Sequence, residues 1–542
     1  MILRSRQKSL RLAAAVIALG FLGALPGFAL RNSQETPRKG GTLRIKSFAD
    51  IFKPNLDPAS GAWIFITEQI FDGLVRLNYN LDIVPSLAEY WKPSDNGRVY
   101  SFYLRRGVRF HDGREMTSQD VKFSFERLLR KETNSPYYEL LASKVVGAAE
   151  FREGKASEVS GFKTPDTYVF EIRWTNPYIS ALSLLSLSFC KILPRDLVEA
   201  QGNDFFWKPV GSGPFRFENW LRSPKLEIVG VRLERNADYF GRKAYLEAVE
   251  FSPYYTIDHF MDREIEIIPF ISDRLAASGC QVLQAGPYNA TCLMMSCQIP
   301  PLDRLPVRKA LICGIDKDKL VRTLASGELV RQATNNYIPP RLPGFFPLDD
   351  AQSFDFNKAA RILEEQGFSS EKKFPELTLF LPAARNDAKQ NEFNIRFGQA
   401  VEEQLNKLGI SVKVKTYRST SEFREFKKPY LVGIKVMMDF PDAENLIRPL
   451  YYSPLGMNGT WYGYDNPGLD KLFEAAEIEP SQARRVELFR KIEKILSEDL
   501  PAVPLFSEEQ RIAVQSYVRG VKVPALGFDY LDAKDIWLVR RK

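Results

Sequence analysis

The chain has 542 residues, of which 75 are basic and 67 acidic, giving a formal net charge of +8. This length predicts about three domains or two large lobes, and a hydrophobic content of 44% is enough to bury substantial cores. Charged residues make up 26% of the chain, which argues against a disordered, collagen-like or coiled-coil protein. Because His111 and His259 are the only histidines, a multi-histidine metal centre is excluded and a histidine-dependent triad has two candidate bases.

Residues 1–29 have the pattern of a secretory signal peptide. Basic residues precede an apolar run from Leu12 to Leu25, and small residues at positions −3 and −1 predict cleavage after Ala29. An uncleaved membrane anchor is the alternative, but the run is short and Pro26 interrupts it. No cysteine lies near the cleavage site, so we expect no lipid anchor and a periplasmic location. The mature chain is only mildly basic, which predicts no nucleic-acid partner.

In the first half, alternating residues predict a strand from Gly41 to Lys46. Residues 63–77 carry Ile66, Ile70 and Leu74 at helical spacing, which predicts a helix that includes these positions. Thr117 resembles an N-cap with Asp120 three residues later, which predicts a helix running through Arg130. Residues 161–174 are expected to form a hairpin, because alternate residues from Tyr168 to Ile172 are apolar beyond a Thr-Pro-Asp turn.

The second half repeats an alternation of strands and helices. A strand is expected to begin at Leu377 and end at Pro382, followed by an amphipathic helix over residues 397–408 that Gly409 stops. A further strand at residues 412–414 and a helix over residues 486–496 continue the pattern. Alternating elements of this kind indicate α/β lobes.

The chain has five cysteines, four of them within one short window, and no close CxxC pair that would indicate a metal cluster. In an oxidising compartment one disulfide and buried free thiols remain alternative readings. The five are Cys190, Cys280, Cys292, Cys297 and Cys313.

Catalytic and cofactor motifs are missing from the sequence. No phosphate loop, GxSxG elbow, HExxH or GxGxxG occurs. Residues 211–213 read Gly-Ser-Gly, but Pro214 follows directly and would interrupt the helix that a nucleophile elbow requires. We therefore expect a binding protein that is not an enzyme and that uses no cofactor or metal.

Longer motifs occur in a fixed order along the chain and together resemble the family 5 extracellular solute-binding proteins of ABC transporters. That family includes the dipeptide- and oligopeptide-binding proteins. The motifs are GGTLR (40–44), EQIFDGLV (68–75), PSLAE (85–89), YLRRGVRFHDG (103–113), MTSQDV (116–121), VGSGPF (210–215), ERNADYF (234–240) and VRKAL (307–311).

This resemblance implies a type II periplasmic-binding-protein fold with two hinged lobes. Lobe I is expected at residues 30–271 together with a C-terminal segment at 506–542, and an extra subdomain is expected near 76–167. Lobe II would then comprise residues 272–505. His111 lies inside the Phe-His-Asp-Gly turn, where the resemblance implies a structural role. Two departures affect the expected pocket: the segment before residue 269 is compressed, and the cysteine group is not a recognised family feature.

The resemblance also implies ligand-binding residues. Asp439 matches the first aspartate of the family's Asp-Tyr-Pro-Asp-Pro segment, which pairs with the peptide ammonium group in peptide-binding members; a turn-capping aspartate is the alternative. Arg385 and Arg396 lie where dipeptide-binding relatives place an arginine that contacts the ligand, with solvated surface charges as the alternative. Arg396 is expected at the start of its helix.

Three aromatic residues complete the predicted site. Trp461 and Tyr462 are candidates for stacking on a ligand side chain, and Trp63 of lobe I is expected to face them. Packing within a core is the alternative for each of them.

The leading hypothesis is a monomeric exported protein that captures di- to oligopeptides by hinge closure and delivers them to an inner-membrane ABC permease. A non-peptide ligand, such as a metallophore, haem, an opine or an oligosaccharide, is the alternative within the family. An exported hydrolase, and a peptide-binding sensor or chaperone, are the alternatives from other classes.

Overall fold

The computed structural model describes residues 36–47, 55–285, 289–324, 329–339, 342, 344–348, 353–383, 388–419, 422, 426–438, 440, 442–454, 462–524 and 526–539. The predicted signal segment and its cleavage site lie outside these residues. The chain divides into two units, Met1–Pro37 and Arg38–Lys542, and the second unit contains all of the elements described below. Within the described ranges, no helix is long and apolar enough to cross a membrane.

A mixed twelve-stranded sheet runs through the second unit in the order β16-β15-β17-β13-β18-β11-β1-β10-β9-β8, and β12 and β14 also pair with β18. The pairings β1–β10 and β15–β16 are parallel, whereas β13 is antiparallel to both of its neighbours. The strands are β1 (Thr42–Lys46), β8 (Phe215–Arg222), β9 (Ile228–Arg235), β10 (Ala248–Ser252), β11 (Ile267–Ile268), β12 (Gln281–Ala285), β13 (Asn289–Met295), β14 (Leu329–Ala333), β15 (Leu377–Pro382), β16 (Val412–Tyr417), β17 (Tyr430–Met437) and β18 (Ala502–Val514).

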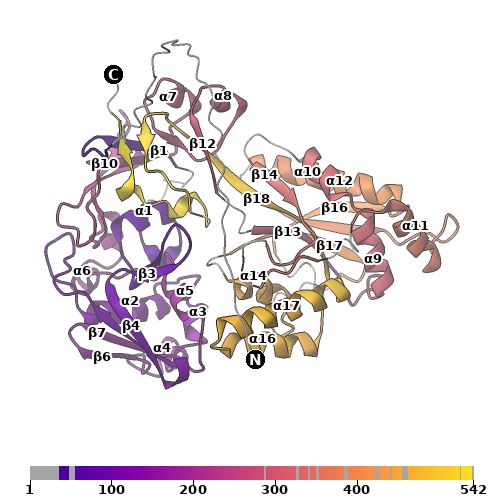
Figure 1. Cartoon of the computed structure of the whole chain (residues 1–542), viewed down its shortest axis with the longest axis horizontal. Coiled ribbons are helices and arrows are strands. Elements are labelled where there is room, and N and C mark those ends of the chain that lie inside the picture. Colours follow the sequence, from indigo (N-terminus) through magenta and orange to yellow (C-terminus); the bar gives the residue numbers. More distant parts are fainter. Residues whose placement is uncertain are drawn as a thin grey trace, which may run out of the picture. The chain divides into compact units, whose positions relative to one another are not determined.

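Strand β18 joins two separate hydrophobic cores (Figure 1). Its first half pairs with β13 and β14, and Phe506 packs in a core formed by residues after 292. Its second half pairs with β12 and β11, and Ile512 and Val514 pack in a core formed by residues before 268 and by the C-terminal segment. The two cores define lobe II and lobe I, respectively, and β18 passes between them.

Lobe I contains β1, β8–β11 and a helix that is shorter than the sequence predicts. β1 is confirmed, with Leu43 and Ile45 fully buried. Helix α1 (Ile64–Ile70) ends early because Phe71 adopts an extended backbone, so the prediction that it includes Leu74 is wrong. Lobe I also contains α6 (Arg195–Gln201), α7 (Ile257–Met261), α8 (Asp273–Ala276), and the pairs β2 (Val75–Leu77) with β3 (Ile83–Pro85) and β19 (Val518–Arg519) with β20 (Trp537–Leu538).

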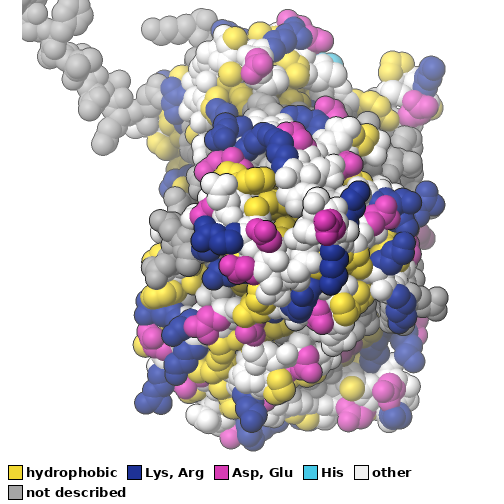
Figure 2. Space-filling view, turned by 90° about the vertical axis from the view of Figure 1, so that its right-hand side faces the viewer, with side chains coloured by type: hydrophobic (Ala, Val, Ile, Leu, Met, Phe, Trp, Pro, Cys, Tyr) yellow, Lys and Arg dark blue, Asp and Glu magenta, His cyan; other side chains and the backbone are white. Residues whose placement is uncertain are grey.

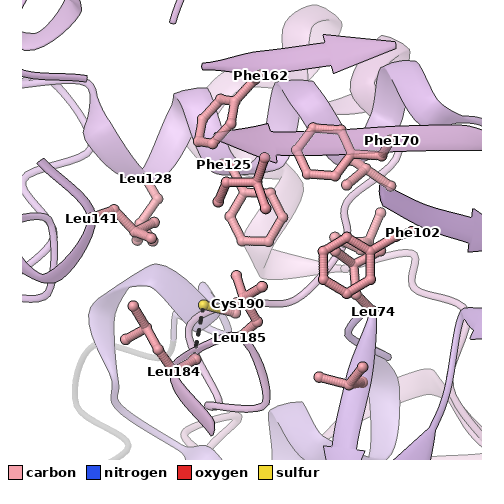
Figure 3. Packing of buried hydrophobic residues seen from close by; sticks show 14 of the residues in the cluster. Leu74, Phe102, Phe125, Leu128, Leu141, Phe162, Phe170, Leu184, Leu185 and Cys190 are labelled. Carbon is pink, nitrogen blue, oxygen red and sulfur yellow. Dashed lines mark hydrogen bonds between the residues drawn. The ribbon is translucent and has the colours of Figure 1, made fainter. Parts of the chain in front are cut away.

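A second sheet, in the order β4-β5-β7-β6, forms the subdomain of lobe I. Its core is shown in Figure 3, where Phe125 lies between Phe162 and Phe170, with ring centroids 5.8 and 5.7 Å away. The predicted hairpin is confirmed, but its turn lies at Thr167 and Tyr168, because residues 164–166, expected as the turn, belong to β6. The buried core of the subdomain includes residues as far as Ile192. The elements are β4 (Ala88–Ser94), β5 (Val99–Leu104), β6 (Phe162–Asp166), β7 (Val169–Arg173), α2 (Ser118–Leu129), α3 (Glu139–Ala142), α4 (Ala148–Arg152) and α5 (Ala181–Leu185).

Helix α2 begins at the capping box predicted from the sequence. The Asp120 carboxylate accepts a hydrogen bond from the Thr117 backbone N–H at 2.9 Å, and the Thr117 side chain caps the first turn in return. These bonds satisfy backbone donors that a helix start leaves unpaired. The predicted N-terminus of the helix is therefore confirmed.

In lobe II, helices cover both faces of the sheet. Successive side chains of β13 point to opposite faces, and each face packs in its own core. Leu293 and Met295 pack on one face with α9 (Leu305–Gly314), α10 (Lys317–Thr323), α11 (Phe356–Glu365) and α12 (Ala388–Lys407). Cys292 and Met294 pack on the other face with α14 (Ala443–Tyr451), α16 (Pro467–Ile478) and α17 (Gln482–Asp499). The predicted strands at 377–382 and 412–414 and the helix over 486–496 are confirmed, and the helix predicted over 397–408 begins earlier, at Ala388.

All five cysteines are free, and Cys190, Cys292 and Cys313 are buried. Burial raises the pKa of the Cys292 thiol to about 12, which keeps it protonated and unreactive at neutral pH. Of the two alternatives left open by the sequence, the structure therefore has the free thiols.

The outer face of lobe II carries both signs of charge. Figure 2 shows Lys and Arg side chains intermixed with Asp and Glu across this face. Such mixing is typical of an ordinary solvated surface, in agreement with the mild net charge.

Candidate functional site

Three of the predicted ligand-binding residues, Asp439, Arg385 and Trp461, lie outside the described residues. Their roles stay predictions. The residues on both sides of Asp439 are described, however, and they are the starting point for the site.

Arg396 lies within α12, not at its start, because the helix begins at Ala388. Its guanidinium donates a hydrogen bond to the backbone carbonyl of Thr323, at the end of α10. This bond links two helices of lobe II, and a contact between Arg396 and a ligand stays a prediction.

The described aromatic candidates belong to two different cores. Tyr462 is 2% exposed in the core of lobe II, and its hydroxyl donates to the carbonyl of Leu450. Trp63 precedes α1 in a left-handed conformation (φ 60°) and packs half-buried against the core of lobe I. This position gives Tyr462 a packing role, and the expected contact of both residues with a ligand stays a prediction.

The segment after β17 reaches from lobe II into lobe I. β17 ends at Met437, and Phe440 follows three residues later. The Phe440 side chain is 4% exposed and packs in the core of the lobe I subdomain, not in either core of lobe II. The buried Phe440 ring therefore attaches the chain that follows β17 to lobe I.

Asp442 strengthens this link between the lobes. Its Oδ1 caps α14 by accepting a hydrogen bond from the Glu444 backbone N–H at 2.9 Å. Its Oδ2 accepts a hydrogen bond at 2.9 Å from the hydroxyl of Ser180, which directly precedes α5 of lobe I. The same carboxylate pairs at 2.6 Å with Arg485 of α17. Arg485 also donates to the Ser180 hydroxyl at 3.3 Å, so the serine bonds to both members of a buried ion pair.

A second set of charges extends the link. Arg485 pairs with Glu444 at 2.7 Å, and Arg448 pairs with Glu477 at 2.8 Å. Lys144 of lobe I pairs with Glu477 of lobe II. We call this set of residues the interlobe contact: Lys144, Ser180, Phe440, Asp442, Glu444, Arg448, Glu477 and Arg485.

Burial and mutual charge set the electrostatics of the interlobe contact. Burial, reinforced by the neighbouring Asp442, raises the pKa of the Glu444 carboxyl. Burial alone would lower the pKa of Arg485, but the adjacent carboxylates of Asp442 and Glu444 raise it above its usual value. Arg485 therefore stays charged, and it is the cation on which both buried carboxylates depend.

Ser212 and His111, the described candidates for a nucleophile and a base, lie in lobe I and are held by contacts with neighbouring residues. Ser212, in the Gly-Ser-Gly turn, is fully buried, and its hydroxyl contacts the Asp72 carboxylate at 3.3 Å. His111 donates from Nε2 to the Gly213 carbonyl at 3.0 Å and accepts at Nδ1 from the Gly211 N–H at 3.2 Å. Burial lowers the pKa of His111 to about 4, so the ring stays neutral and links two segments of lobe I.

The interlobe contact could be predicted from the sequence only in part. The Asp-Ala-Glu triplet at 442–444 follows the segment that the resemblance singled out, and it carries a helix N-cap signal. Ser180 and Arg485 carry no local signal, because their partners lie 262 and 43 residues away along the chain.

Comparisons with known proteins agree with this architecture. The model of the bacterial extracellular solute-binding proteins, family 5 middle, matches residues 82–458. The dipeptide-binding protein of Escherichia coli (strain K12) is 25% identical over 508 residues, covering 88% of this chain and 90% of that protein. The heme-binding protein A of Haemophilus influenzae is 23% identical over 502 residues, covering 88% and 89%.

Among solved structures, the murein tripeptide-binding protein MppA in its unliganded open form has a TM-score of 0.77 at 21% identity, covering 93% of this chain and 98% of that chain. Two lobes joined by a shared sheet, with a subdomain in the first, thus define a type II periplasmic-binding-protein fold. The family match covers more than half of the chain, and the chain belongs to the family 5 bacterial extracellular solute-binding proteins.

Proposed function

We propose that the chain is the exported binding protein of an ABC importer, and that it captures peptides between its lobes for delivery to a membrane permease. The observation that carries the proposal is the position of the segment around Asp439. Phe440 packs in the core of lobe I and Asp442 bonds to Ser180 of lobe I, while β17 belongs to the sheet of lobe II. Met438, on the other side of Asp439, packs in a core of lobe II, so the described neighbours of Asp439 belong to different lobes, which supports a role for Asp439 between them.

The proposed mechanism uses the lobes as two walls of one site. Asp439 would hold the ligand's ammonium group, and Arg385 or Arg396 would hold its carboxylate. Trp63, Trp461 and Tyr462 would contact its side chains. A ligand that touches both lobes stabilises the closed arrangement, because only that arrangement makes both sets of contacts. β18 connects the lobes continuously and would bend or twist at the junction.

The domain limits and the location belong to the same proposal. The proposed limits are residues 30–271 with 506–542 for lobe I and 272–505 for lobe II, with β18 crossing between them. Leu275 of α8 and Leu283 of β12 also pack with the cores of lobe I, which extends lobe I beyond residue 271. Residues 1–29 would direct export to the periplasm and be removed. Membership of an extracellular binding-protein family supports this location.

Calorimetric titration with tri-alanine and with N-acetyl-tri-alanine tests the ligand class and the anchor together. Removing one partner of a desolvated charge pair costs about 2–5 kcal/mol, so the acetylated peptide should bind at least ~30-fold more weakly. The Asp439→Asn variant should bind both peptides equally weakly. Asp465→Asn, an exposed aspartate elsewhere in lobe II, is the matched control and should behave as the parent protein does.

Two results would contradict the proposal in different ways. If Asp439→Asn binds tri-alanine as tightly as the parent protein, Asp439 does not hold the ammonium group, although the protein still binds peptides. If the parent protein binds no peptide, peptides would be excluded as its ligand class. The second candidate is then a non-peptide ligand, and the relative that is a heme-binding protein makes haem the first compound to titrate.

A further inference from the structure

Lobe I contains a pocket of about 240 Å³ that no predicted ligand residue lines. Its walls come from the end of α1, the β2–β3 region, the segment after α5 and the C-terminal segment at residues 520–524 and 526–535. All of these belong to lobe I, so the pocket exists without any contribution from lobe II. Its volume is below the roughly 300–1,000 Å³ of sites for drug-sized ligands, which indicates a smaller occupant.

The floor of the pocket holds a buried carboxylate with weak partners. Asp72 is 7% exposed. It is contacted by the hydroxyls of Ser212 and Tyr239 at 3.3 Å and of Ser86 at 3.4 Å. Hydroxyl-to-carboxylate hydrogen bonds are normally about 2.5–2.7 Å long, so these contacts leave the carboxylate poorly satisfied. Burial raises the pKa of Asp72 to about 6, and the group is still mainly ionised at neutral pH.

Glu68 adds an unsatisfied acceptor to the same pocket. Its Oε2 accepts a hydrogen bond from Lys191 at 2.7 Å, whereas its Oε1 is buried and has no hydrogen-bond partner among the described residues. Buried polar atoms are normally paired, and leaving one unpaired costs free energy. A donor supplied by a ligand would remove this cost.

Cationic side chains also line the pocket, and Lys191, Arg76 and Lys534 lie close enough to act on the Asp72 carboxylate. Arg76 is 42% exposed and reaches Asp532 only at 3.8 Å, and Lys522 is a second cation in the lining. In all, the lining contains four acidic residues (Glu68, Asp72, Asp532 and Asp535) and four basic residues (Arg76, Lys191, Lys522 and Lys534). Because the lining has no net charge but contains charges of both signs, it suits a ligand that carries one positive and one negative group.

We infer that this pocket binds a small zwitterion of the size of a free amino acid, separately from the ligand held between the lobes. Its ammonium group would donate to Glu68 Oε1 and to the Asp72 carboxylate, and its carboxylate would pair with Arg76 and Lys522. Each end would thereby exchange water for charge-assisted hydrogen bonds. The inference goes beyond the proposed function and does not rest on it, because lobe closure adds nothing to this pocket.

Equilibrium dialysis with radiolabelled L-alanine is the test. Ethylamine lacks the carboxylate of alanine and propionate lacks its ammonium group, so each should compete at least ~10-fold more weakly than unlabelled alanine, a difference of about 1.4 kcal/mol. Glu68→Gln and Arg76→Gln should each weaken alanine binding by a similar factor. Because Glu68 pairs with the buried Lys191, the more exposed Arg76 supplies the variant that keeps the fold.

Arg216→Gln and Asp439→Asn are the controls. Arg216 pairs with Glu234 on an exposed strand of lobe I, outside the pocket lining, and its substitution should leave alanine binding unchanged. Asp439→Asn should also leave it unchanged. Loss of alanine binding in Asp439→Asn would overturn the inference, because the label would then occupy the interlobe site. Failure of the parent protein to bind alanine, or equal binding by Arg76→Gln, would also overturn it.

Discussion

Replacing Arg485 with methionine should destabilise the protein strongly, because it leaves two buried carboxylates without their cation. The Arg485 side chain is 4% exposed and pairs with Asp442 at 2.6 Å and Glu444 at 2.7 Å, whose side chains are 11% and 10% exposed. Removing one partner of a buried ion pair costs about 3–5 kcal/mol. Arg448 compensates little, since it lies 3.4 Å from Glu444 and is shared with Glu477.

Urea unfolding at neutral pH, followed by circular dichroism, measures this loss. Arg490→Met is the matched control, because Arg490 lies on the same helix, pairs with Glu487 and is 45% exposed. Exposed ion pairs contribute about 0–1 kcal/mol, so the control should stay within that range. The triple variant Asp442→Asn, Glu444→Gln and Arg485→Met removes all three charges and should regain much of the stability lost by the single variant.

Two outcomes of the urea unfolding experiment would contradict this prediction. A loss below about 1 kcal/mol for Arg485→Met would mean that the buried pairs contribute no more than surface pairs do. A triple variant less stable than the single variant would mean that the cost does not arise from uncompensated carboxylates.

Two further predictions concern lobe I. Burial holds the pKa of His111 at about 4, below its usual 6.5, so protonation is favoured in the unfolded chain; the free energy of unfolding should fall by up to about 3 kcal/mol as the pH drops from 6.5 to 4. His111→Gln should flatten this part of the pH profile in urea unfolding, and an unchanged slope would contradict the assignment. A Cβ at Gly211 would lie 2.0 Å from the Ile70 carbonyl oxygen, so Gly211→Ala should cost about 1–3 kcal/mol or more. If Gly211→Ala unfolds at the same melting temperature as the parent protein, this packing argument is wrong.

Local patterns predicted the elements of the fold well where the signal lies within a few residues. The capping box of Thr117 and Asp120 and the stop at Gly409 depend only on neighbouring positions, and both are found as expected. α1 shows the limit of such reasoning. Leu74 continues the helical spacing, but Gly73 packs against the backbone carbonyl of Cys190, and this tertiary contact favours an extended chain after residue 70.

The site was less predictable, because its geometry depends on distant residues. The resemblance pointed to the segment at Asp439, and the described neighbours of that residue do contact lobe I. Spacing alone gave no reason to expect that Phe440 packs in the core of the other lobe, or that Arg485 supplies the cation for Asp442. Tyr462 shows the opposite case, since an aromatic residue in a promising motif lies within a core.

The central claim is that the chain captures peptides, and its bound ligand tests this most directly. The protein should be purified natively and denatured, and the released small molecules should be identified by mass spectrometry. The Asp439→Asn variant, purified in the same way, shows which compounds depend on the predicted anchor. We expect di- to oligopeptides from the parent protein and far fewer from the variant. Release of haem, a sugar or another non-peptide compound in place of peptides would contradict the central claim.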